Sequence, residues 1–412
     1  MNKAWKICLI VVTSLIALLA LAWLETALAY NSADYANRII ANLWDPTGVK
    51  DYAKFTSREI KNSSPVFNFK KQLNEDMVNS MFVKAGYMSG GKEMQIQDLD
   101  TFLKTNSTTS FIVIKDDTIL YEKYFNGYQR DSICTSFSVA KSFDSTLMGL
   151  AIEDGYIKSV NEPIINYLPE LNRDGLGAVT IRNLLTMSSG IHYAEAYASW
   201  GDDALTYYYP DLRKIALIVR MDGKPGEHFW YNNYHPLLEG MIIERATHKH
   251  VATYLEEKIW SRIGMEFSAS WSLDSKETGF EKMESGINAR SIDFAKFGRL
   301  FLNKGNWEGT QVVPSGWVTV ATTMSDDVRA SNRNYYSLYE NSPMFHSHTT
   351  YYKYHWWGLD RGSGDYDYFA AGNFGQYIYV CPSKDVIIVR NGTGFGNVDA
   401  WPGIFFRVAG QF

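Results

Sequence analysis

The chain of 412 residues is long enough for one large domain with additions, or for two domains. Its apolar share of 46% against 21% charged residues is typical of a globular protein with a substantial core. The net charge is −5, and lysine and arginine are spread along the chain, which excludes a basic patch for nucleic acid.

The first 29 residues have the pattern of a targeting segment. Lys3 and Lys6 precede a stretch without any charge, residues 7–24, and a small-x-small sequence follows at 27–29. This pattern describes a secretory signal peptide, but the uncharged stretch is also nearly long enough to span a bilayer. Residues 1–29 are therefore either a cleaved signal peptide or a membrane anchor held through 7–24. Both alternatives export the rest of the chain to the periplasmic or extracellular side.

Residues 30–95 form a polar, weakly patterned lead-in segment that ends near SGGKEMQIQD (89–98). The main domain is expected over 96–412. At its start, SFIVIK (110–115) and TILYEKYF (118–125) are two strand patterns joined by an Asp-Asp pair, which predicts a β-hairpin.

The next stretch, TSFSVAKSF (135–143), opens an apolar helical pattern that ends at Gly155. Ser138 and Lys141 are three residues apart and share a helix face. A serine hydroxyl is a poor nucleophile until a neighbour takes its proton, and a desolvated lysine can be that neighbour. A serine near a helix start with a solvated lysine gives the same short pattern, so S-x-x-K alone does not establish an active site.

Three cysteines are too few for a disulfide framework, and Cys8 belongs to the leader. Cys134 and Cys381 are far apart in the sequence. We interpret them as two free, buried thiols, with a pair formed in an oxidising compartment as the alternative.

A second motif lies in GEHFWYNNYHPLLEG (226–240), where Tyr231 and Asn233 form Y-x-N just before Pro236 and an amphipathic helix. A tyrosine hydroxyl works as a base when a neighbouring ammonium group stabilises its anion. The two-sided amide of an asparagine can hold the lysine and a substrate carbonyl. Serine, lysine, tyrosine and asparagine together are a complete set for acyl transfer.

A third motif, FAAGNFGQYIYV (369–380), places the turn Gly372–Asn373 before a strand, where a backbone N–H can face an oxyanion. GQYIYV (375–380) and DVIIVR (385–390) then predict a second strand pair, whereas 156–300 is mostly helical. Strands at both ends with helices between them predict an α+β fold: one antiparallel sheet built from both chain ends, flanked by helices, with an inserted helical region.

From about Leu99 to the C-terminus, the chain resembles the serine β-lactamase and penicillin-binding-protein superfamily. It is most similar to the class C β-lactamase-related branch, which includes esterases, D-aminopeptidases and 6-aminohexanoate-dimer hydrolases. The resemblance rests on the three motifs above together with TIRNLLTMSSGI (180–191) and SGINARSIDFAKFGRLFLNKG (285–305). It implies a β-lactamase-like fold.

The resemblance also implies roles for individual residues. Ser138 becomes the nucleophile, Lys141 and Tyr231 the base pair, and Asn233 a polar positioner. The turn that supplies the second oxyanion N–H is formed by Gly372 and Asn373.

The family's third motif usually has a lysine or histidine where this chain has Ala370. This departure favours neutral substrates over penicillins. Tyr197, in the loop after TMSSG, is a further candidate for the cleft. The histidines of HKH (248–250) and HSH (346–348) have no acidic or cysteine partners at ligand spacing and are interpreted as surface residues, so no metal site is predicted.

We therefore expect an exported serine hydrolase that cleaves an amide or ester through an acyl-enzyme intermediate, without a metal or organic cofactor. Its substrate is expected to be a small-molecule ester, an amide or a short peptide-like compound. Two alternatives remain. One is a non-catalytic cell-envelope binding protein on the same fold, and the other is a true β-lactamase or D,D-peptidase.

Overall fold

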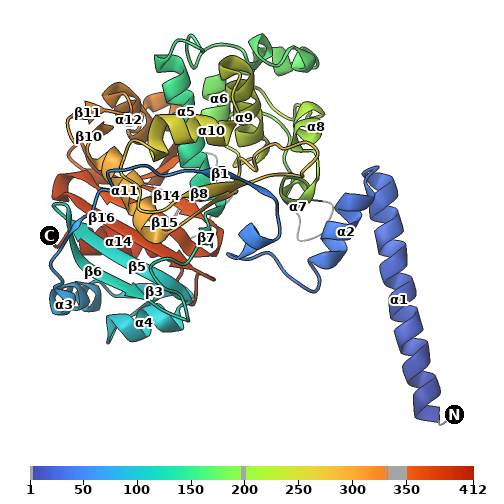
Figure 1. The fold of residues 1–412 in the computed structure, drawn as a ribbon, viewed down its shortest axis with the longest axis horizontal. Helices are drawn as coiled ribbons and strands as arrows, with labels where there is room; N and C mark the ends of the chain where they lie inside the picture. Colours follow the sequence, from blue (N-terminus) through green and yellow to red (C-terminus); the bar gives the residue numbers. More distant parts are fainter. Residues whose placement is uncertain (1–2, 196–200, 330, 333–349) are drawn as a thin grey trace.

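A computed structural model describes residues 3–195, 201–329, 331–332 and 350–412 (Figure 1). Its main feature is an eight-stranded sheet in the order β12-β13-β14-β15-β16-β5-β6-β2, antiparallel except between β2 and β6. Both chain ends contribute strands, as predicted. The strands are β2 (Lys70–Lys71), β5 (Thr108–Lys115), β6 (Thr118–Tyr124), β12 (Thr350–Lys353), β13 (Trp356–Gly362), β14 (Asp365–Gly372), β15 (Gln376–Cys381) and β16 (Val386–Gly392).

The two predicted hairpins are both present. The turn between β5 and β6 consists of Asp116 and Asp117, which have φ angles of 49° and 56°. Aspartate tolerates this left-handed region better than most residues, which suits a two-residue hairpin turn. The β15–β16 pair encloses CPSK as predicted, and Cys134 and Cys381 are free and buried.

Helices cover both faces of the large sheet. Successive side chains along each strand point alternately into two hydrophobic cores, one on each face. On β5, Ile112 and Ile114 pack in the core shared with α11 (Ser291–Leu302). Phe111 and Val113 point to the opposite core. That second core is completed by α3 (Glu75–Ala85), α4 (Leu99–Thr105) and α14 (Trp401–Ala409).

The inserted helical region lies beside the α11 face of the sheet (Figure 1). Its central helix, α5 (Ala140–Glu153), is buried on all sides from Ala140 to Ala151. Gly155, with φ 79°, follows the end of α5 as predicted. The other helices of this half are α6 (Ile181–Leu185), α7 (Asp202–Tyr208), α8 (Leu212–Leu217), α9 (Tyr234–Thr247), α10 (Val251–Leu255) and α12 (Ser315–Thr322).

Shorter elements connect these parts. A small sheet has the order β1-β8-β9-β7 and contains β1 (Ser57–Ile60), β7 (Cys134–Thr135), β8 (Ala269–Ser272) and β9 (Ile287–Ala289). Two further hairpins are β3–β4 (Tyr87–Ser89, Lys92–Met94) and β10–β11 (Asn306–Trp307, Thr310–Gln311). Single helical turns are η1 (Asp51–Ala53), η2 (Phe137–Val139), η3 (Ile164–Asn166), η4 (Pro169–Leu171), η5 (Leu176–Ala178), η6 (Glu256–Trp260), η7 (Asn373–Gly375) and η8 (Pro382–Lys384).

The lead-in segment contacts the body at several points. Strand β1 pairs with β8, and β2 pairs with β6. The SGG sequence of 89–91 forms the turn of the β3–β4 hairpin, where the N–H groups of Gly90 and Gly91 donate to Asp399 near the C-terminus.

Helix α1 (Lys3–Ala29) projects away from the body, and α2 (Ala33–Ala41) follows it at the body's edge (Figure 1). By length and composition, residues 4–29 of α1 are long and apolar enough to cross a membrane. An N-terminal signal sequence has the same properties, so the helix is compatible with either form of targeting segment.

Candidate active site

The structure brings Ser138 and Lys141 into direct contact. Ser138 lies in η2, the single turn that leads into α5, and is half-buried. Lys141 Nζ lies 2.9 Å from Ser138 Oγ and 3.0 Å from the backbone oxygen of Glu284. Lys141 is only 1% exposed, so this ammonium group has lost its water and depends on these partners. The predicted pairing of the two residues on one helix face is therefore present.

Tyr231 also contacts Lys141. The lysine Nζ is 4.9 Å from the centroid of the tyrosine ring, a cation–π contact. The ring stacks on Trp357 at a centroid distance of 6.3 Å and meets the edge of Tyr352 at 5.8 Å. Among the described residues, no hydrogen bond joins Tyr231 to Ser138. Lys141 Nζ thus contacts both the hydroxyl of Ser138 and the ring of Tyr231.

Asn233 caps the start of α9 and lines the same cavity as Ser138. Its Nδ2 donates to the hydroxyl oxygen of Tyr193 at 2.8 Å and to Thr206 Oγ1 at 3.4 Å, instead of binding near Lys141. Its Oδ1 is buried and has no hydrogen-bond partner. The acceptor side of this amide is therefore not satisfied by the described residues.

Gly372, the last residue of β14, packs against the backbone that carries Ser138. A Cβ atom at this position would overlap the carbonyl oxygen of Ser136 and lie 3.2 Å from the backbone nitrogen of Ser138. The next residue, Asn373, lines the cavity with Ser138. Glycine is required here because the end of β14 and the turn that carries Ser138 approach so closely.

The turn that carries Ser138 is stabilised by aromatic packing. Phe137 has a φ of 47°, a left-handed conformation that is unusual for a bulky residue. Its ring lies 5.0 Å from Phe374, which also has a positive φ of 60°, and stacks on Tyr207 at 6.2 Å. These contacts stabilise a strained residue directly beside Ser138, as is common at functional sites.

Ser138 lines a cavity of about 830 Å³. The body contributes aromatic and polar groups to it: Phe137, Ser138, Asp203, Ala204, Tyr207, Tyr208, Asn233, Glu284, Ser285 and Asn373. Sequence reasoning missed Glu284 and Tyr207, because neither belongs to a motif with a chemical role. Tyr197, predicted for the cleft, lies outside the described residues.

Among the residues that the structure describes, no cation at this cavity replaces the missing lysine or histidine of the third motif. Ala370 is fully buried in the core beneath the sheet. Arg390 is also fully buried, and its guanidinium donates to the backbone oxygens of Asn106, Gly375 and Gly394. Arg361 pairs with Asp367 at the far end of β13 and β14. None of the described residues that line the cavity is a lysine, arginine or histidine.

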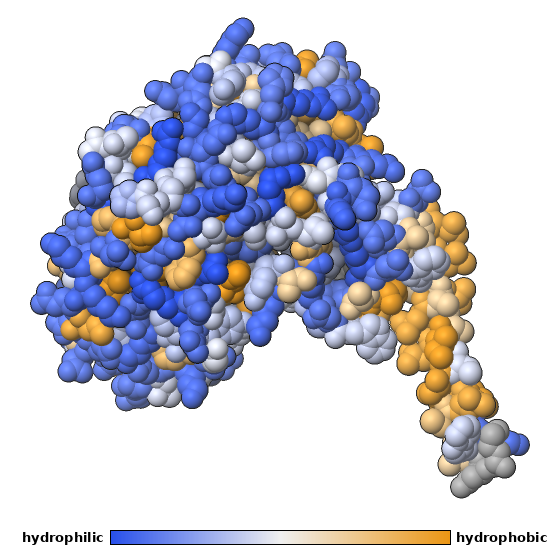
Figure 2. Space-filling model, viewed as in Figure 1, coloured by the Kyte–Doolittle hydropathy of each residue, from blue (hydrophilic) through white to orange (hydrophobic). Residues whose placement is uncertain are grey.

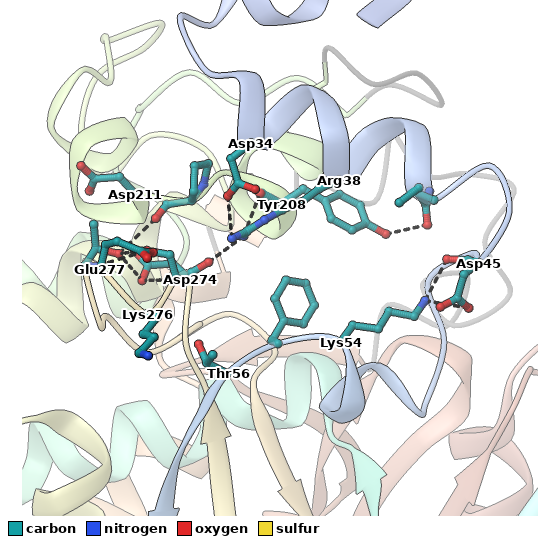
Figure 3. Close-up of a pocket in the computed structure, with 16 residues that line it drawn as sticks. Asp34, Arg38, Asp45, Lys54, Thr56, Tyr208, Asp211, Asp274, Lys276 and Glu277 are labelled. Carbon is teal, nitrogen blue, oxygen red and sulfur yellow. Dashed lines mark hydrogen bonds and ion pairs between the residues drawn. The ribbon is translucent and has the colours of Figure 1, made fainter. Parts of the chain in front are cut away.

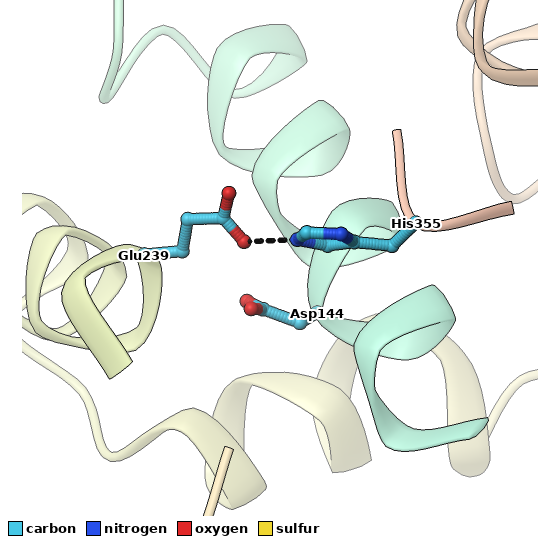
Figure 4. Close-up of side chains that lie close together, drawn as sticks. All are labelled: Asp144, Glu239 and His355. Atoms are coloured by element: carbon cyan, nitrogen blue, oxygen red, sulfur yellow. Dashed lines mark hydrogen bonds and ion pairs between the residues drawn. The ribbon is translucent and has the colours of Figure 1, made fainter. Parts of the chain in front are cut away.

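A fully buried polar cluster includes a residue of α5, the helix that carries Lys141 (Figure 4). Asp144 of α5, Glu239 of α9 and His355 place their ligand-type atoms within 4.8 Å of one another, close enough to hold a cation. In the arrangement described, His355 Nε2 is hydrogen-bonded to Glu239 Oε2 at 2.7 Å. Both carboxyl oxygens of Asp144 and Oε1 of Glu239 have no hydrogen-bond partner.

The cluster has two carboxyl groups and only one group, the imidazole of His355, that could carry a positive charge. Burial lowers the pKa of His355 well below its usual value, which keeps the imidazole neutral. Burial, followed by the neighbouring Glu239, raises the pKa of Asp144, and burial raises the pKa of Glu239 to about 8. At neutral pH the two carboxyl groups therefore retain a proton in the folded protein.

This proton makes stability depend on pH. Because the folded-state pKa of Glu239 is raised from 4.5 to about 8, the folded protein binds more protons than the unfolded chain in this window. The free energy of unfolding should then fall as pH rises from 6 to 9, by an amount on the order of a few kcal/mol. Urea unfolding of chelator-dialysed protein at these two pH values measures the loss.

Glu239→Gln should reduce this pH dependence, since Asp144 stays buried and keeps part of it, whereas Glu153→Gln, at an exposed position on α5, should leave it unchanged. A wild-type profile that is already flat between pH 6 and 9 would show that the cluster does not take up a proton on folding.

Comparison with known proteins identifies the family of this chain. Residues 100–404 match the β-lactamase family model. The 6-aminohexanoate-dimer hydrolase of Paenarthrobacter ureafaciens is 26% identical over 328 residues, which is 75% of this chain and 76% of that protein.

Two solved structures share the fold. A 6-aminohexanoate-dimer hydrolase assigned in Bacillus anthracis superposes with a TM-score of 0.73 at 22% identity, over 89% of this chain and 93% of that one. A mutant class C β-lactamase superposes with a TM-score of 0.58 at 14% identity, over 83% of this chain and 99% of that one. Since the family model spans most of the chain, this protein belongs to the β-lactamase family and is a serine hydrolase.

Proposed function

We propose that this protein is an exported hydrolase that cleaves an amide or ester through an acyl-enzyme formed on Ser138. The observation that carries the proposal is the 2.9 Å contact between Ser138 Oγ and the buried Lys141 Nζ, at the wall of a cavity of about 830 Å³. A binding protein does not need a desolvated lysine against a serine, because that lysine costs stability. The cost is explained if the lysine moves a proton.

In the first half of the reaction, Ser138 Oγ attacks the substrate carbonyl and forms a carbon–oxygen bond. The serine proton passes to the pair of Lys141 and Tyr231. For this step the pair must have lost one proton, so that it is either a neutral lysine beside a phenol or an ammonium beside a phenolate. The pair then returns this proton to the departing amine or alcohol as its bond to the carbonyl carbon breaks. In the second half, a water molecule gives a proton to the pair and its oxygen attacks the acyl carbon. The bond to Ser138 Oγ then breaks, the pair returns the proton to this oxygen, and the acid is released.

The oxyanion of each tetrahedral intermediate is proposed to lie between the backbone N–H groups of Ser138 and Asn373. The close packing of Gly372 on the nucleophile's turn supports this assignment, since it keeps the two backbone segments together. The acceptor oxygen of Asn233 is proposed to receive a substrate N–H.

Two observations support an amide or a neutral ester as substrate. The relative from Paenarthrobacter ureafaciens is named for the hydrolysis of 6-aminohexanoate dimer. The cavity's described lining also has no cation to hold the carboxylate of a penicillin.

A direct test compares kcat/KM for benzylpenicillin with kcat/KM for a neutral ester of similar size. Loss of one side of a buried charge pair costs on the order of 2–5 kcal/mol. We therefore expect the ester to be favoured by roughly 30-fold or more. Should the penicillin equal or surpass the ester, the protein is a true β-lactamase and the missing cation has no effect.

A further inference from the structure

The buried cluster of Asp144, Glu239 and His355 has no part in the proposed reaction, and its three side chains point toward one another (Figure 4). Asp144 and Glu239 are 0% exposed and His355 is 2% exposed. Their ligand-type atoms lie within 4.8 Å of one another, so a small movement of the side chains places one metal ion in contact with all three. The cluster therefore offers one imidazole and two carboxylates to a cation.

The oxygen atoms of this cluster outnumber the donors that could satisfy them. Both carboxyl oxygens of Asp144 and Oε1 of Glu239 are buried and have no hydrogen-bond partner. Glu239 Oε2 is the one carboxyl oxygen of the cluster that has a partner among the described residues, His355 Nε2 at 2.7 Å. A buried carboxylate oxygen without a partner is costly, so three of them in one place indicate a site for a cation.

The basic groups near the cluster have other partners. Lys141 acts electrostatically on both carboxyl groups. Its Nζ is nevertheless hydrogen-bonded to Ser138 Oγ and to the backbone oxygen of Glu284, and among the described residues no ion pair joins it to Asp144 or Glu239. The neighbouring imidazole of His235 is hydrogen-bonded through Nε2 to Ser189 Oγ at 2.6 Å. No protein cation is therefore in direct contact with the unpaired oxygens.

Other buried carboxylates of this chain do have donors. Asp274, in the pocket beside α2, is buried, and its oxygens accept hydrogen bonds from three backbone N–H groups at 2.7 to 3.0 Å (Figure 3). Asp293 is also buried. It accepts from two backbone N–H groups and lies 3.6 Å from Lys296 Nζ. Asp144 differs from both, because neither of its oxygens has a donor.

A second group in the chain has the same ligand types and provides an internal comparison. Glu244, His250 and Glu281 also have ligand-type atoms within 4.8 Å of one another. Here, however, Glu244 pairs with Arg213 at 2.7 Å, and Glu281 pairs with Arg58. Arginine already supplies the positive charge in this group, so it has less need of a metal ion.

His355 is held so that its Nε2 faces the two carboxyl groups. It is the second residue of the two-residue turn between β12 and β13, and its backbone oxygen accepts a hydrogen bond from Ser142 Oγ of α5 at 2.7 Å. Its Nδ1 lies 2.9 Å from the hydroxyl oxygen of Tyr352. When Nδ1 donates to that oxygen, Nε2 is the unprotonated nitrogen, which is the form of histidine that binds metals.

The ligand types select the class of cation. Mg²⁺ and Ca²⁺ prefer oxygen ligands alone, whereas one imidazole nitrogen with carboxylate oxygens suits Zn²⁺ and related first-row divalent ions. Two ionised carboxylates also balance the charge of one divalent ion. We infer that Asp144, Glu239 and His355 bind one Zn²⁺-type cation. The alternative occupant is the proton that the two carboxyl groups share in the metal-free protein.

Such an ion joins three elements that surround the candidate active site. Helix α5 carries Lys141, and α9 follows directly after Asn233. Strand β13 starts beside His355 and includes Trp357, which stacks on the ring of Tyr231. The role of the ion is therefore structural: it fixes these elements relative to one another and stabilises the fold.

The first test measures the zinc content of the full chain, produced without a polyhistidine tag in medium that contains Zn²⁺. The protein is kept in detergent, because α1 exposes a long apolar surface (Figure 2). We expect about one Zn²⁺ per chain by mass spectrometry, and the same value after removal by a chelator and slow titration with Zn²⁺ alone. About a tenfold excess of Mg²⁺ or Ca²⁺ should not displace it. Wild-type protein without zinc by both routes overturns the proposal, since the occupant is then a proton alone.

Isosteric variants locate the ion. Asp144→Asn and Glu239→Gln keep the size of each side chain and remove one negative charge, and each should lower the affinity for Zn²⁺ by about 100-fold or more. His250→Gln, in the comparison group, should keep the wild-type affinity. Retained binding in the first two variants, or its loss in His250→Gln, contradicts the assignment.

Thermal unfolding shows that each variant folds and separates metal binding from a packing role. Without metal, Asp144→Asn should unfold at or above the wild-type temperature, because the new amide donates to Glu239 in place of an unpaired carboxyl group. Added Zn²⁺ should raise the midpoint of the wild type by several degrees and leave that of Asp144→Asn unchanged. Equal shifts for the two proteins, or no shift for the wild type, overturn the proposal.

X-ray absorption at the zinc edge identifies the ligands directly. One imidazole nitrogen and carboxylate oxygens at about 2.0–2.2 Å are expected, whereas a sulfur ligand at about 2.3 Å assigns the ion to a cysteine and overturns the site. None of these measurements depends on a reaction at Ser138. Failure of the zinc site therefore leaves the proposed function intact, and absence of hydrolysis leaves the zinc site intact.

Discussion

Ser138→Ala should abolish labelling by a fluorophosphonate probe and lower kcat for ester hydrolysis by on the order of 10⁴–10⁶. The probe forms a covalent bond with an activated serine oxygen, and Ser138 Oγ is the hydroxyl in contact with the buried Lys141. The substitution removes a single oxygen from a half-buried residue, so the fold should be retained. Intact mass spectrometry of the labelled wild type should show one adduct.

Ser145→Ala is the matched control. This serine lies on the same helix, is fully buried and makes no hydrogen bond through its Oγ. The variant should therefore label and turn over substrate like the wild type. Equal labelling of the wild type and Ser138→Ala would mean that another residue reacts, and the proposal of an acyl-enzyme on Ser138 would be wrong.

The second large effect concerns the base. Lys141→Ala and Tyr231→Phe should each lower kcat by about 10³ or more, and the double variant should be scarcely worse than the more damaged single variant. Groups that act as one unit are strongly non-additive, because the second substitution removes what the first has already disabled. The measurement is kcat at saturating neutral ester for the four members of the cycle.

Tyr231→Phe is an informative substitution because it retains the ring. The stack on Trp357 and the contact with Lys141 Nζ depend on the ring face, and only the hydroxyl is lost. A normal kcat for this variant would show that the tyrosine acts through its ring, as support for the lysine. If the losses from the two single variants simply multiply, the residues work independently and the shared-proton mechanism is incorrect.

The contact of Ser138 with Lys141 could be predicted because it is local. Residues three apart at a helix start share a face in any fold, so the S-x-x-K pattern and the helical period are enough. The same holds for the β5–β6 hairpin, whose Asp116–Asp117 turn suits the left-handed backbone conformation that a two-residue turn requires. The buried thiols of Cys134 and Cys381 follow the ordinary preference of free cysteine.

Motif spacing identified Tyr231, Asn233 and Gly372 as candidates, but their geometry depends on chain segments far apart in the sequence. Lys141 meets the ring of Tyr231 because α5 packs against α9. Asn233 turns its amide nitrogen to Tyr193 instead of the lysine. Nothing local to these residues predicts either partner, because each partner is chosen by the packing of two elements.

The sequence by itself therefore determined the fold class, the contact of Ser138 with Lys141, and an apolar N-terminal stretch. The tertiary structure decided what surrounds Ser138. It placed the fully buried Asp144, Glu239 and His355 side by side, removed Arg390 from the cleft and brought α1 and α2 to the cavity wall. The physical reason is that backbone periodicity acts over a few residues, whereas burial, charge balance and the lining of a cavity are properties of segments that meet only after folding.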